Sequence, residues 1–353
     1  MTSFLQPKFF NNLRLQKKLG TIDDKNTVDA NKVSNQKEAS ETEVVQIESK
    51  YVRFVTNYKP IHRGGWADIV NAMDSKLDFH KENKRVFYDI LEMEFRVKPG
   101  KVQTQQWIGI LHILQYKNPT DCIFSNPNFI KSLRTCKGLI TLAPNLRDYA
   151  LKKVKEYNYN IPVYLIKHPI LFSDVPLFSF EKYAQNLNKY IIQIGQQDRK
   201  ISSLGIINSP GHTKLWLTGI KDMKEAQQRL NFEKREMGRV FPPFKMLYTN
   251  TFDEYDAFLS ENVVFLDFHV AVANNTVVEC ILRNTPLILN KTESLIYYLG
   301  KDYPLFYTKL DEVPDLLSLE KILEANIYLK NMDKTDITIE YFLDSLRNIL
   351  KSS

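Results

Sequence analysis

The amino-acid sequence predicts an α/β protein built from two doubly wound halves, and three observations support that fold class. Short apolar runs alternate with amphipathic segments along most of the chain, which is the pattern of parallel strands connected by helices. The length of 353 residues is too great for one ordinary core and suits two domains. Each half also carries a glycine-bearing loop after an apolar run, Gly64-Gly65 in the first and Gly195 in the second.

Composition and periodicity divide the chain into four parts. The first is polar and has no apolar periodicity, so it cannot bury enough surface to offset its ordering entropy. The last has apolar residues at helical spacing after Asp336, its expected N-cap. A stretch at 171–188 with little apolar spacing is the expected linker between the domains. The predicted parts are a disordered low-complexity tail (1-48), an N-terminal Rossmann-like domain (49-175), a C-terminal Rossmann-like domain (186-335) and an amphipathic helix (336-353).

The elements of the first half follow from its apolar runs and helical spacings. The expected strands are 51–55, 85–91, 107–112, 138–142 and 161–166, and the expected helices are 66–77, 129–135 and 145–157. His112, Glu92 and Glu94 fall at the carboxyl ends of expected strands, which meet at one edge of a parallel sheet. Catalytic groups gather at that edge in open α/β folds, although a histidine there can also be an ordinary core residue.

The Gly64-Gly65 pair precedes the first expected helix of the fold. Glycines at a helix entrance let the backbone approach a ligand, and the helix N-terminus offers unpaired amides. The same pair also suits a tight turn that needs positive φ. If the loop binds a ligand, the side chains expected to point into the cleft that it lines are those of His62, Arg63, Trp66 and Asp68.

The second half is organised around residues 263–290, which read as a strand, a loop, a helix and a second strand. The loop carries His269 and Asn274-Asn275, and such a loop together with the next helix N-terminus is where ligands sit in parallel sheets. The polar helix expected at 222–237 is most simply a solvated face. The expected strands are 190–194, 214–217, 263–267, 286–289 and 304–307, and the expected helices are 222–237, 253–259, 276–283, 293–299 and 314–331.

Glu279 lies one turn inside the helix expected at 276–283, and two interpretations of it stay open. In the first, the carboxylate faces a ligand at the helix N-terminus. In the second, Thr276 and Glu279 form a capping box, and the carboxylate only satisfies the first amides of its own helix.

Composition limits the class of protein. No apolar run approaches the roughly 18–20 residues that span a bilayer, and the N-terminus has no secretory core. The three cysteines are widely spaced in apolar surroundings, typical of reduced thiols in a cytoplasmic protein. The net charge of +7 comes from scattered residues without a nucleic-acid-binding motif, so solvated faces explain it and no nucleic-acid partner is expected. A peripheral membrane contact is compatible with this charge.

Several segments resemble, in order, GT-B glycosyltransferases of the group found in polysaccharide-synthesis gene clusters and large DNA viruses. Glu279 and Pro286 match an element that places a glutamate on the ribose hydroxyls of the donor in these enzymes. The resembling segments cover about residues 50 to 310, and they are 62–66 with Asp68, 107–112, 136–142, 162–169, 192–195 with Arg199, 274–281 and 298–306.

This resemblance implies two facing Rossmann-like domains, with an acceptor site in the first, a nucleotide-sugar site in the second and a last helix that crosses back. Many GT-B enzymes carry a second glutamate eight residues before the ribose-binding one, where this chain has Ala271. That difference favours an inverting over a retaining reaction. The chain has no Asp-x-Asp motif, so no metal or other cofactor is expected beyond the nucleotide-sugar co-substrate.

Glycosyl transfer then assigns candidate roles. The departing nucleoside diphosphate needs fixed donors, which the helix start at Asn275-Thr276 and the cation Arg199 (or Lys200) are expected to supply. An inverting reaction needs a base for the acceptor hydroxyl, and the candidates in descending order are His112, Asp68 and His62. The expected donor-binding residues are Glu279, Asn275, Thr276, Arg199, Gly195 and His269, and the acceptor-side loop includes Gly64, Gly65, Trp66 and Glu94.

The acceptor is expected to be a glycan, a lipid-linked molecule or a protein. Two alternatives stay open: a nucleotide-sugar 2-epimerase on the same scaffold, and a non-catalytic protein that binds a nucleotide, a sugar or nucleic acid. A dehydrogenase is disfavoured because no G-x-G-x-x-G follows a strand.

Overall fold

The structure is a computed structural model that describes residues 65–77, 85–97, 100–114, 122–171, 174–238 and 241–352. The tail expected at 1-48, the strand expected at 51–55, and the residues His62 and Gly64 lie outside the described residues.

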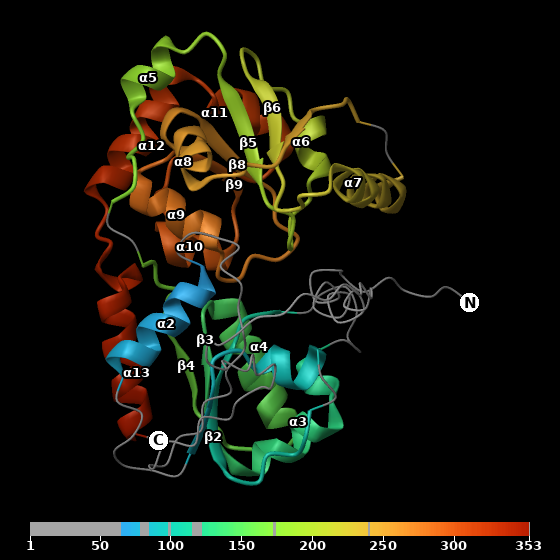
Figure 1. Cartoon of the computed structure of the whole chain (residues 1–353), viewed down its shortest axis with the longest axis vertical. Helices are drawn as coiled ribbons and strands as arrows, with labels where there is room; N and C mark the ends of the chain where they lie inside the picture. The colour runs from blue at the N-terminus through green and yellow to red at the C-terminus, as the bar shows by residue number, and fades with distance from the viewer. Residues whose placement is uncertain are drawn as a thin grey trace, which may run out of the picture.

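Two parallel sheets form the centres of two domains stacked along the long axis (Figure 1). The first has the order β1-β2-β3-β4, and its strands are β1 (Arg85–Tyr88), β2 (Gln106–Leu111), β3 (Cys136–Thr141) and β4 (Val163–Leu165). The second has the order β10-β9-β8-β5-β6-β7, and its strands are β5 (Tyr190–Ile194), β6 (Thr213–Leu217), β7 (Lys245–Leu247), β8 (Val263–Leu266), β9 (Leu287–Asn290) and β10 (Phe306–Tyr307). The expectation of an α/β protein with two Rossmann-like domains is confirmed.

The order of the second sheet contains a topological switch point. From β5 the chain adds β6 and β7 on one side, and it then returns to place β8 on the other side of β5. Loops at the carboxyl ends of two such strands diverge and leave a crevice, which is where open α/β sheets bind ligands. The loops that follow β5 and β8 are therefore the first place to look for a site.

Helices cover both faces of the first sheet. On one face, α3 (Pro127–Ser132) and α4 (Pro144–Glu156) pack on a core that includes Trp107 and Leu139. On the other face, α2 (Trp66–Lys76) and the last helix, α13 (Ile339–Ser352), pack on Phe87, Ile108 and Ile140. The chain thus crosses back to complete the first domain with α13, as the resemblance to GT-B enzymes implies (Figure 1).

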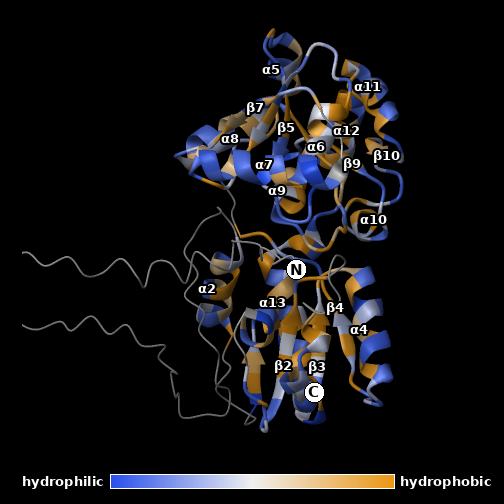
Figure 2. Ribbon diagram, turned by 90° about the vertical axis from the view of Figure 1, so that its right-hand side faces the viewer, coloured by the Kyte–Doolittle hydropathy of each residue, from blue (hydrophilic) through white to orange (hydrophobic). Residues whose placement is uncertain are grey.

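The second sheet is flanked by α5 (Phe180–Gln185), α6 (Ser202–Ile206), α7 (Met223–Met237), α8 (Phe252–Glu261), α9 (Asn275–Arg283), α10 (Glu293–Leu299), α11 (Val313–Leu316) and α12 (Leu319–Asn331). Figure 2 shows α7 as largely hydrophilic, in keeping with the expected solvated face. One helix of this group, α5, lies inside the stretch expected to be a linker. It is six residues long and is started by Ser179, whose hydroxyl accepts from the amide of Lys182.

Several local expectations were wrong. The strand expected at 85–91 ends at Tyr88, and Glu94 lies instead in a wide helical turn, Met93–Val97. The N-cap of α13 is not Asp336 but Thr338, whose hydroxyl accepts from the amide of Tyr341 at 3.3 Å. The Asp336 carboxylate instead pairs with Lys167 Nζ at 2.7 Å, because the chain makes a helical turn at Thr335–Ile337 before the helix starts.

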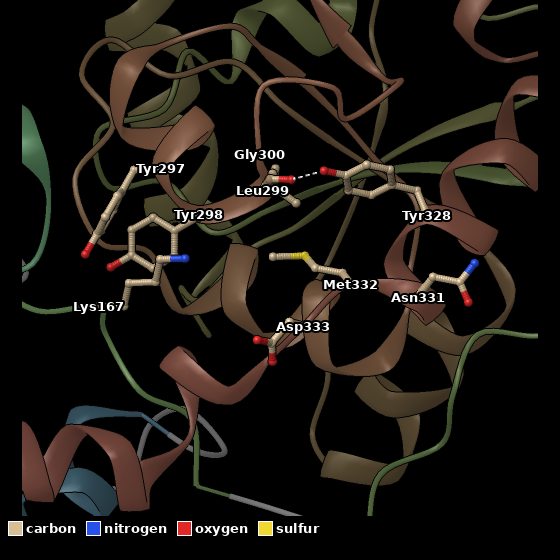
Figure 3. A pocket seen from close by; sticks show the side chains of 9 residues that line it. All are labelled: Lys167, Tyr297, Tyr298, Leu299, Gly300, Tyr328, Asn331, Met332 and Asp333. Atoms are coloured by element: carbon tan, nitrogen blue, oxygen red, sulfur yellow. Dashed lines mark hydrogen bonds between the residues drawn. The ribbon is translucent and has the colours of Figure 1, made fainter.

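The two domains are joined by direct polar contacts. The hydroxyl of Tyr298, on α10, donates to Leu142 O at 2.7 Å and accepts from His168 N at 2.8 Å. A cavity of about 550 Å³ opens beside this contact, between α10, the end of α12 and Lys167 (Figure 3). Both Lys167 and Tyr297 line this cavity, and the ammonium of Lys167 lies 4.9 Å from the centre of the Tyr297 ring.

Candidate functional site

The loops that follow β5 and β8 meet at the switch point and are joined through their backbones. Lys200 N donates to Asp267 O at 2.7 Å, and His269 N donates to Asp198 O at 2.9 Å. The turn begins at Gly195, whose φ of +66° favours glycine. A Cβ added at Gly195 would lie 3.1 Å from Arg199 Nη1, so a side chain here would also crowd the guanidinium.

Arg199 is a buried cation that connects this turn to the start of α9. Its Nη2 donates to Asn274 Oδ1 at 2.8 Å and to Thr276 Oγ1 at 3.1 Å, and the residue is only 6% exposed. Burial lowers the pKa of Arg199 to about 10, opposed mainly by the negative charge of Asp198, so the guanidinium stays charged at neutral pH. The site therefore holds a fixed positive charge against a helix N-terminus, which is itself electropositive.

The start of α9 decides between the two interpretations of Glu279. The N-cap is Asn274, whose Oδ1 accepts from Thr276 N at 3.1 Å. The carboxylate of Glu279 accepts a hydrogen bond from the hydroxyl of Tyr255, on α8, at 2.6 Å and does not reach back to the amides of its own helix. The capping-box interpretation is therefore wrong, since the cap and the carboxylate have other partners.

Glu279 is 3% exposed, and burial raises the pKa of its carboxyl to about 7. The hydrogen bond from Tyr255 and the charges of Arg283 and Arg199 oppose this rise, while Asp256 adds to it. A carboxyl that titrates near neutral pH at the carboxyl edge of a sheet is typical of functional sites, although structural networks produce the same effect.

Lys200, the alternative to Arg199 as the predicted cation, and His269, a member of the predicted donor-binding set, are both half-buried. The Lys200 ammonium lies 3.1 Å from Asp267 Oδ1, and its side chain is 35% exposed. Asp267 Oδ2 accepts from Ser203 Oγ at 2.6 Å, so this carboxylate fixes Lys200 and the start of α6 together. His269 is half-buried, one residue beyond the short bridge between Arg199 and Phe268.

In the first domain, the structure brings His112, Trp66 and Glu92 together at the carboxyl edge of the sheet. Glu92 Oε1 accepts from the amides of His112 at 2.7 Å and Ile113 at 2.8 Å. Glu92 Oε2 lies 3.8 Å from His112 Nδ1. The rings of Trp66 and His112 meet edge to face, with centroids 4.3 Å apart.

Both ring nitrogens of His112 are enclosed and have no hydrogen-bond partner among the described residues. The Trp66 ring also contacts His168, with ring centroids 5.3 Å apart, and burial lowers the pKa of His168 to about 4, so His168 is neutral at physiological pH. His112 shares no hydrogen bond with Asp68 or Glu94, which are both half-buried in their own helical turns. His112, Asp68 and Glu94 stay predictions, as does Gly65 at the N-cap of α2.

Asn145, at the start of α4 in the first domain, binds the second domain at the switch-point loop. Its Nδ2 donates to Ala271 O at 2.8 Å, and its Oδ1 accepts from Ser294 Oγ at 2.7 Å. Ala271 is the residue that stands where the resembling enzymes carry a second glutamate, and here its carbonyl serves the domain contact. Sequence reasoning missed both Asn145 and Tyr255, because their partners lie far away in the chain.

No helix in the described ranges is long and apolar enough to cross a membrane. No group of three or more His, Cys, Asp or Glu side chains in this part of the chain is arranged to hold a metal ion.

No family model and no curated protein matches the sequence significantly, whereas solved structures match its fold. The N-terminal domain of trehalose-6-phosphate phosphatase from Candida albicans is similar with a TM-score of 0.51 at 13% identity, over 82% of this chain and 75% of that one. The trehalose-6-phosphate synthase OtsA gives 0.52 at 13% identity, over 82% and 77%.

A trehalose-6-phosphate synthase studied for glycosyl transfer with retention gives a TM-score of 0.51 at 11% identity, over 85% of this chain and 81% of that one. At such low identity these likenesses show a shared fold. The chain therefore has the GT-B fold, with two facing Rossmann-like domains.

Proposed function

We propose that the protein is a glycosyltransferase that moves a sugar from a nucleotide-sugar donor to a hydroxyl of a glycan, lipid-linked or protein acceptor. The observation that carries this proposal is the group of residues at the switch point. The buried Arg199 is bonded to Asn274 and Thr276 at the start of α9, and the Glu279 carboxylate lies one turn further along the same helix. A cation, a helix N-terminus and a carboxylate in this order suit a nucleoside diphosphate.

Each part of the donor has a partner in this arrangement. The departing diphosphate gains negative charge in the transition state, and a pre-oriented cation and helix N-terminus stabilise that charge without reorganisation. Gly195 permits the left-handed turn with which this loop approaches the phosphates, and Lys200 adds a half-exposed cation once it leaves its pair with Asp267. Glu279 accepts from the ribose hydroxyls.

The acceptor binds against the first domain, and His112 takes the proton from its hydroxyl. Glu92 supports this base by fixing the chain at His112 and Ile113 and by facing the ring with its second oxygen. Because both nitrogens of His112 are enclosed, the groups packed around this ring, Trp66 among them, have to move before an acceptor can reach the nitrogens. Asp68 and His62 are the remaining candidates for the base.

We propose further that the transfer inverts the anomeric configuration of the sugar. Ala271 removes a carboxylate from the loop after β8, which favours inversion at the anomeric carbon, and the reaction proceeds without a metal. A role in building polysaccharides fits the resemblance of the sequence. The anomeric configuration of the product, measured by NMR, tests the predicted inversion.

The first experiment measures the melting temperature of the protein with a panel of nucleoside diphosphates and nucleotide sugars. A ligand that binds only the folded state adds about 2.7 kcal/mol of stability at a concentration of one hundred times Kd. We expect a shift with one nucleotide, its loss in Glu279→Gln, and its retention in the control Glu320→Gln, an exposed residue on α12. The absence of a shift with every nucleotide would overturn the assignment of the donor site.

Because the proposed base, His112, is enclosed, epimerisation of the donor is the alternative reaction to consider. A nucleotide-sugar 2-epimerase needs no separate acceptor, and His112 is closed to one in this structure. Turnover of the donor without any added acceptor, with the nucleotide sugar recovered as its epimer, would favour that alternative over transfer.

A further inference from the structure

We propose that Tyr255 is a positioning residue of the donor site, which orients the Glu279 carboxylate so that one defined oxygen meets the ribose of a nucleoside diphosphate. This inference rests on the proposed function. To the ribose contact proposed for Glu279 it adds Tyr255, a residue from α8, a helix that contributes no other member to the candidate site.

The geometry assigns different roles to the two oxygens of Glu279. Oε2 accepts from the Tyr255 hydroxyl at 2.6 Å, a short bond of the kind that a charged acceptor makes. Oε1 accepts no hydrogen bond from the described residues, although Glu279 is only 3% exposed. With Oε2 held from the side of α8, the plane of the carboxylate is fixed and Oε1 is the oxygen presented to a ligand.

The other groups around Glu279 do not hold it in this way. Arg283 Nη2 is bonded to Asp256 at 2.6 Å, and Arg199 Nη2 is bonded to Asn274 and Thr276. Among the described residues, the Tyr255 hydroxyl is therefore the one side-chain group that donates to this carboxylate. Its removal leaves a buried carboxylate without a donor and free to rotate.

A ribose hydroxyl that reaches Oε1 donates a hydrogen bond to it. A nucleotide that lacks this hydroxyl cannot donate to Oε1, so the orientation of the carboxylate does not affect its affinity. Tyr255 therefore affects ribonucleotides and the matching deoxynucleotide differently, whereas damage to the fold affects both equally.

The protonation of Glu279 supplies a second readout. A hydrogen bond to the ribose is accepted by the ionised carboxylate, so binding is full above the pKa of Glu279 and is lost as the pH falls through it. Tyr255 lowers this pKa, as do Arg283 and Arg199, whereas burial and Asp256 raise it. Removing the hydroxyl therefore moves the midpoint of binding to a higher pH.

The test compares Tyr255→Phe with the wild type by calorimetric titration between pH 5.5 and 8.5. The probe is whichever of UDP, GDP, ADP and CDP stabilises the wild type, used with its 2′-deoxy and 3′-deoxy forms. The control is Tyr303→Phe, which removes a buried hydroxyl that donates to Leu287 O and accepts from Leu287 N in the same domain.

We expect Tyr255→Phe to weaken the ribonucleotide about tenfold or more, the usual effect of losing a hydrogen bond to a charged group. The deoxy form that lacks the recognised hydroxyl weakens less, and the pH midpoint for the ribonucleotide rises. Tyr303→Phe leaves both the affinity and the midpoint unchanged.

An unchanged affinity and midpoint in Tyr255→Phe would overturn the inference while the proposed function stands. An equal loss for all three nucleotides with an unchanged midpoint would also overturn it, since that is the signature of structural damage. If the wild type binds none of the four nucleotides, the proposed function itself falls, and the role of Tyr255 falls with it.

Discussion

Burial raises the pKa of Glu279 from its ordinary value of 4.5 to about 7, so this side chain links folding to pH. The folded state disfavours the ionised carboxylate, so the stability contributed by Glu279 is fully present below pH 4.5 and is lost as the pH rises through about 7. The size of this loss is on the order of 3 kcal/mol at most.

Chemical denaturation of the wild type and Glu279→Gln at several pH values measures this effect. We expect the wild type to lose stability relative to the mutant between pH 4.5 and about 7, and the difference to stay constant above that range. His168, whose pKa is lowered to about 4, costs stability below its ordinary pKa of 6.5 in both proteins and cancels. A difference that does not change with pH would contradict the prediction.

The ion pair between Arg283 and Asp256 is fully buried, with side chains 0% and 4% exposed. Because removal of one partner leaves an unpaired buried charge, Asp256→Ala is expected to cost about 3–5 kcal/mol of unfolding free energy. The double mutant with Arg283→Met should recover part of that loss. The exposed pair Lys321 and Glu324 is the control, and Glu324→Ala should change stability by less than about 1 kcal/mol in the same urea titration.

At this scale, the sequence predicts residues whose partners are close in the chain. Asn274, Thr276 and Glu279 belong to one strand-loop-helix pattern, so their position at the switch point follows from local spacing. The bond between Tyr255 and Glu279 joins two helices, and the bonds of Glu92 to the end of β2 join two separate segments. No spacing rule predicts such pairs, because the packing of the sheet determines them.

Among the elements, α13 offers a sharp test of helix capping. Thr338→Ala removes the hydroxyl that accepts from Tyr341 N, and it is expected to cost about 1 kcal/mol. Asp336→Ala is the matched control two residues earlier. This variant loses the ion pair with Lys167. Because the Asp336 side chain is 41% exposed, the loss should lower the unfolding free energy by no more than about 1 kcal/mol.

The two variants are best separated by hydrogen exchange of the first turn of α13. Thr338→Ala should increase exchange there, whereas Asp336→Ala should leave it unchanged. Faster exchange in Asp336→Ala but not in Thr338→Ala would show that Asp336 is the N-cap, as the sequence predicts.

Strand and helix types were largely predictable, because apolar runs and helical spacing are strong local signals. The misses are short elements without such signals. The edge strand β7 has three residues, two of them exposed, so it shows no buried run. The five-residue helix α6 contains Gly205 and has no apolar periodicity, and tertiary packing holds it. A Cβ at Gly205 would lie 2.4 Å from the Phe241 ring.

For the whole molecule, the contact of Tyr298 with the first domain is the central test. Tyr298→Phe removes both hydrogen bonds of this hydroxyl and leaves Leu142 O and His168 N unpaired in a buried boundary. We expect a loss of about 1–3 kcal/mol in unfolding free energy and weaker coupling between the domains. Denaturation followed by the fluorescence of Trp107 in the first domain and Trp216 in the second measures both.

The control is Tyr328→Phe, whose hydroxyl bonds to Leu299 O within the second domain. It should lower stability without separating the two fluorescence transitions. If Tyr298→Phe also leaves the transitions coincident and the stability unchanged, the hydroxyl does not couple the domains.

The facing arrangement of the domains was predicted only through the resemblance to GT-B enzymes. Composition and spacing indicate two halves but carry no information on how they meet. The contacts that join them, such as Asn145 with Ala271 O, use side chains and carbonyls more than one hundred positions apart.

The position of α13 has a consequence for the order of events during synthesis. This helix covers the face of the first sheet formed by Phe87, Ile108 and Ile140, yet the ribosome makes it after every strand of the second domain. The domain translated first thus has an apolar face that α2 covers only in part until α13 emerges, and the domain translated second can be finished earlier. A nascent chain stalled before residue 339 should accordingly need a chaperone at that face.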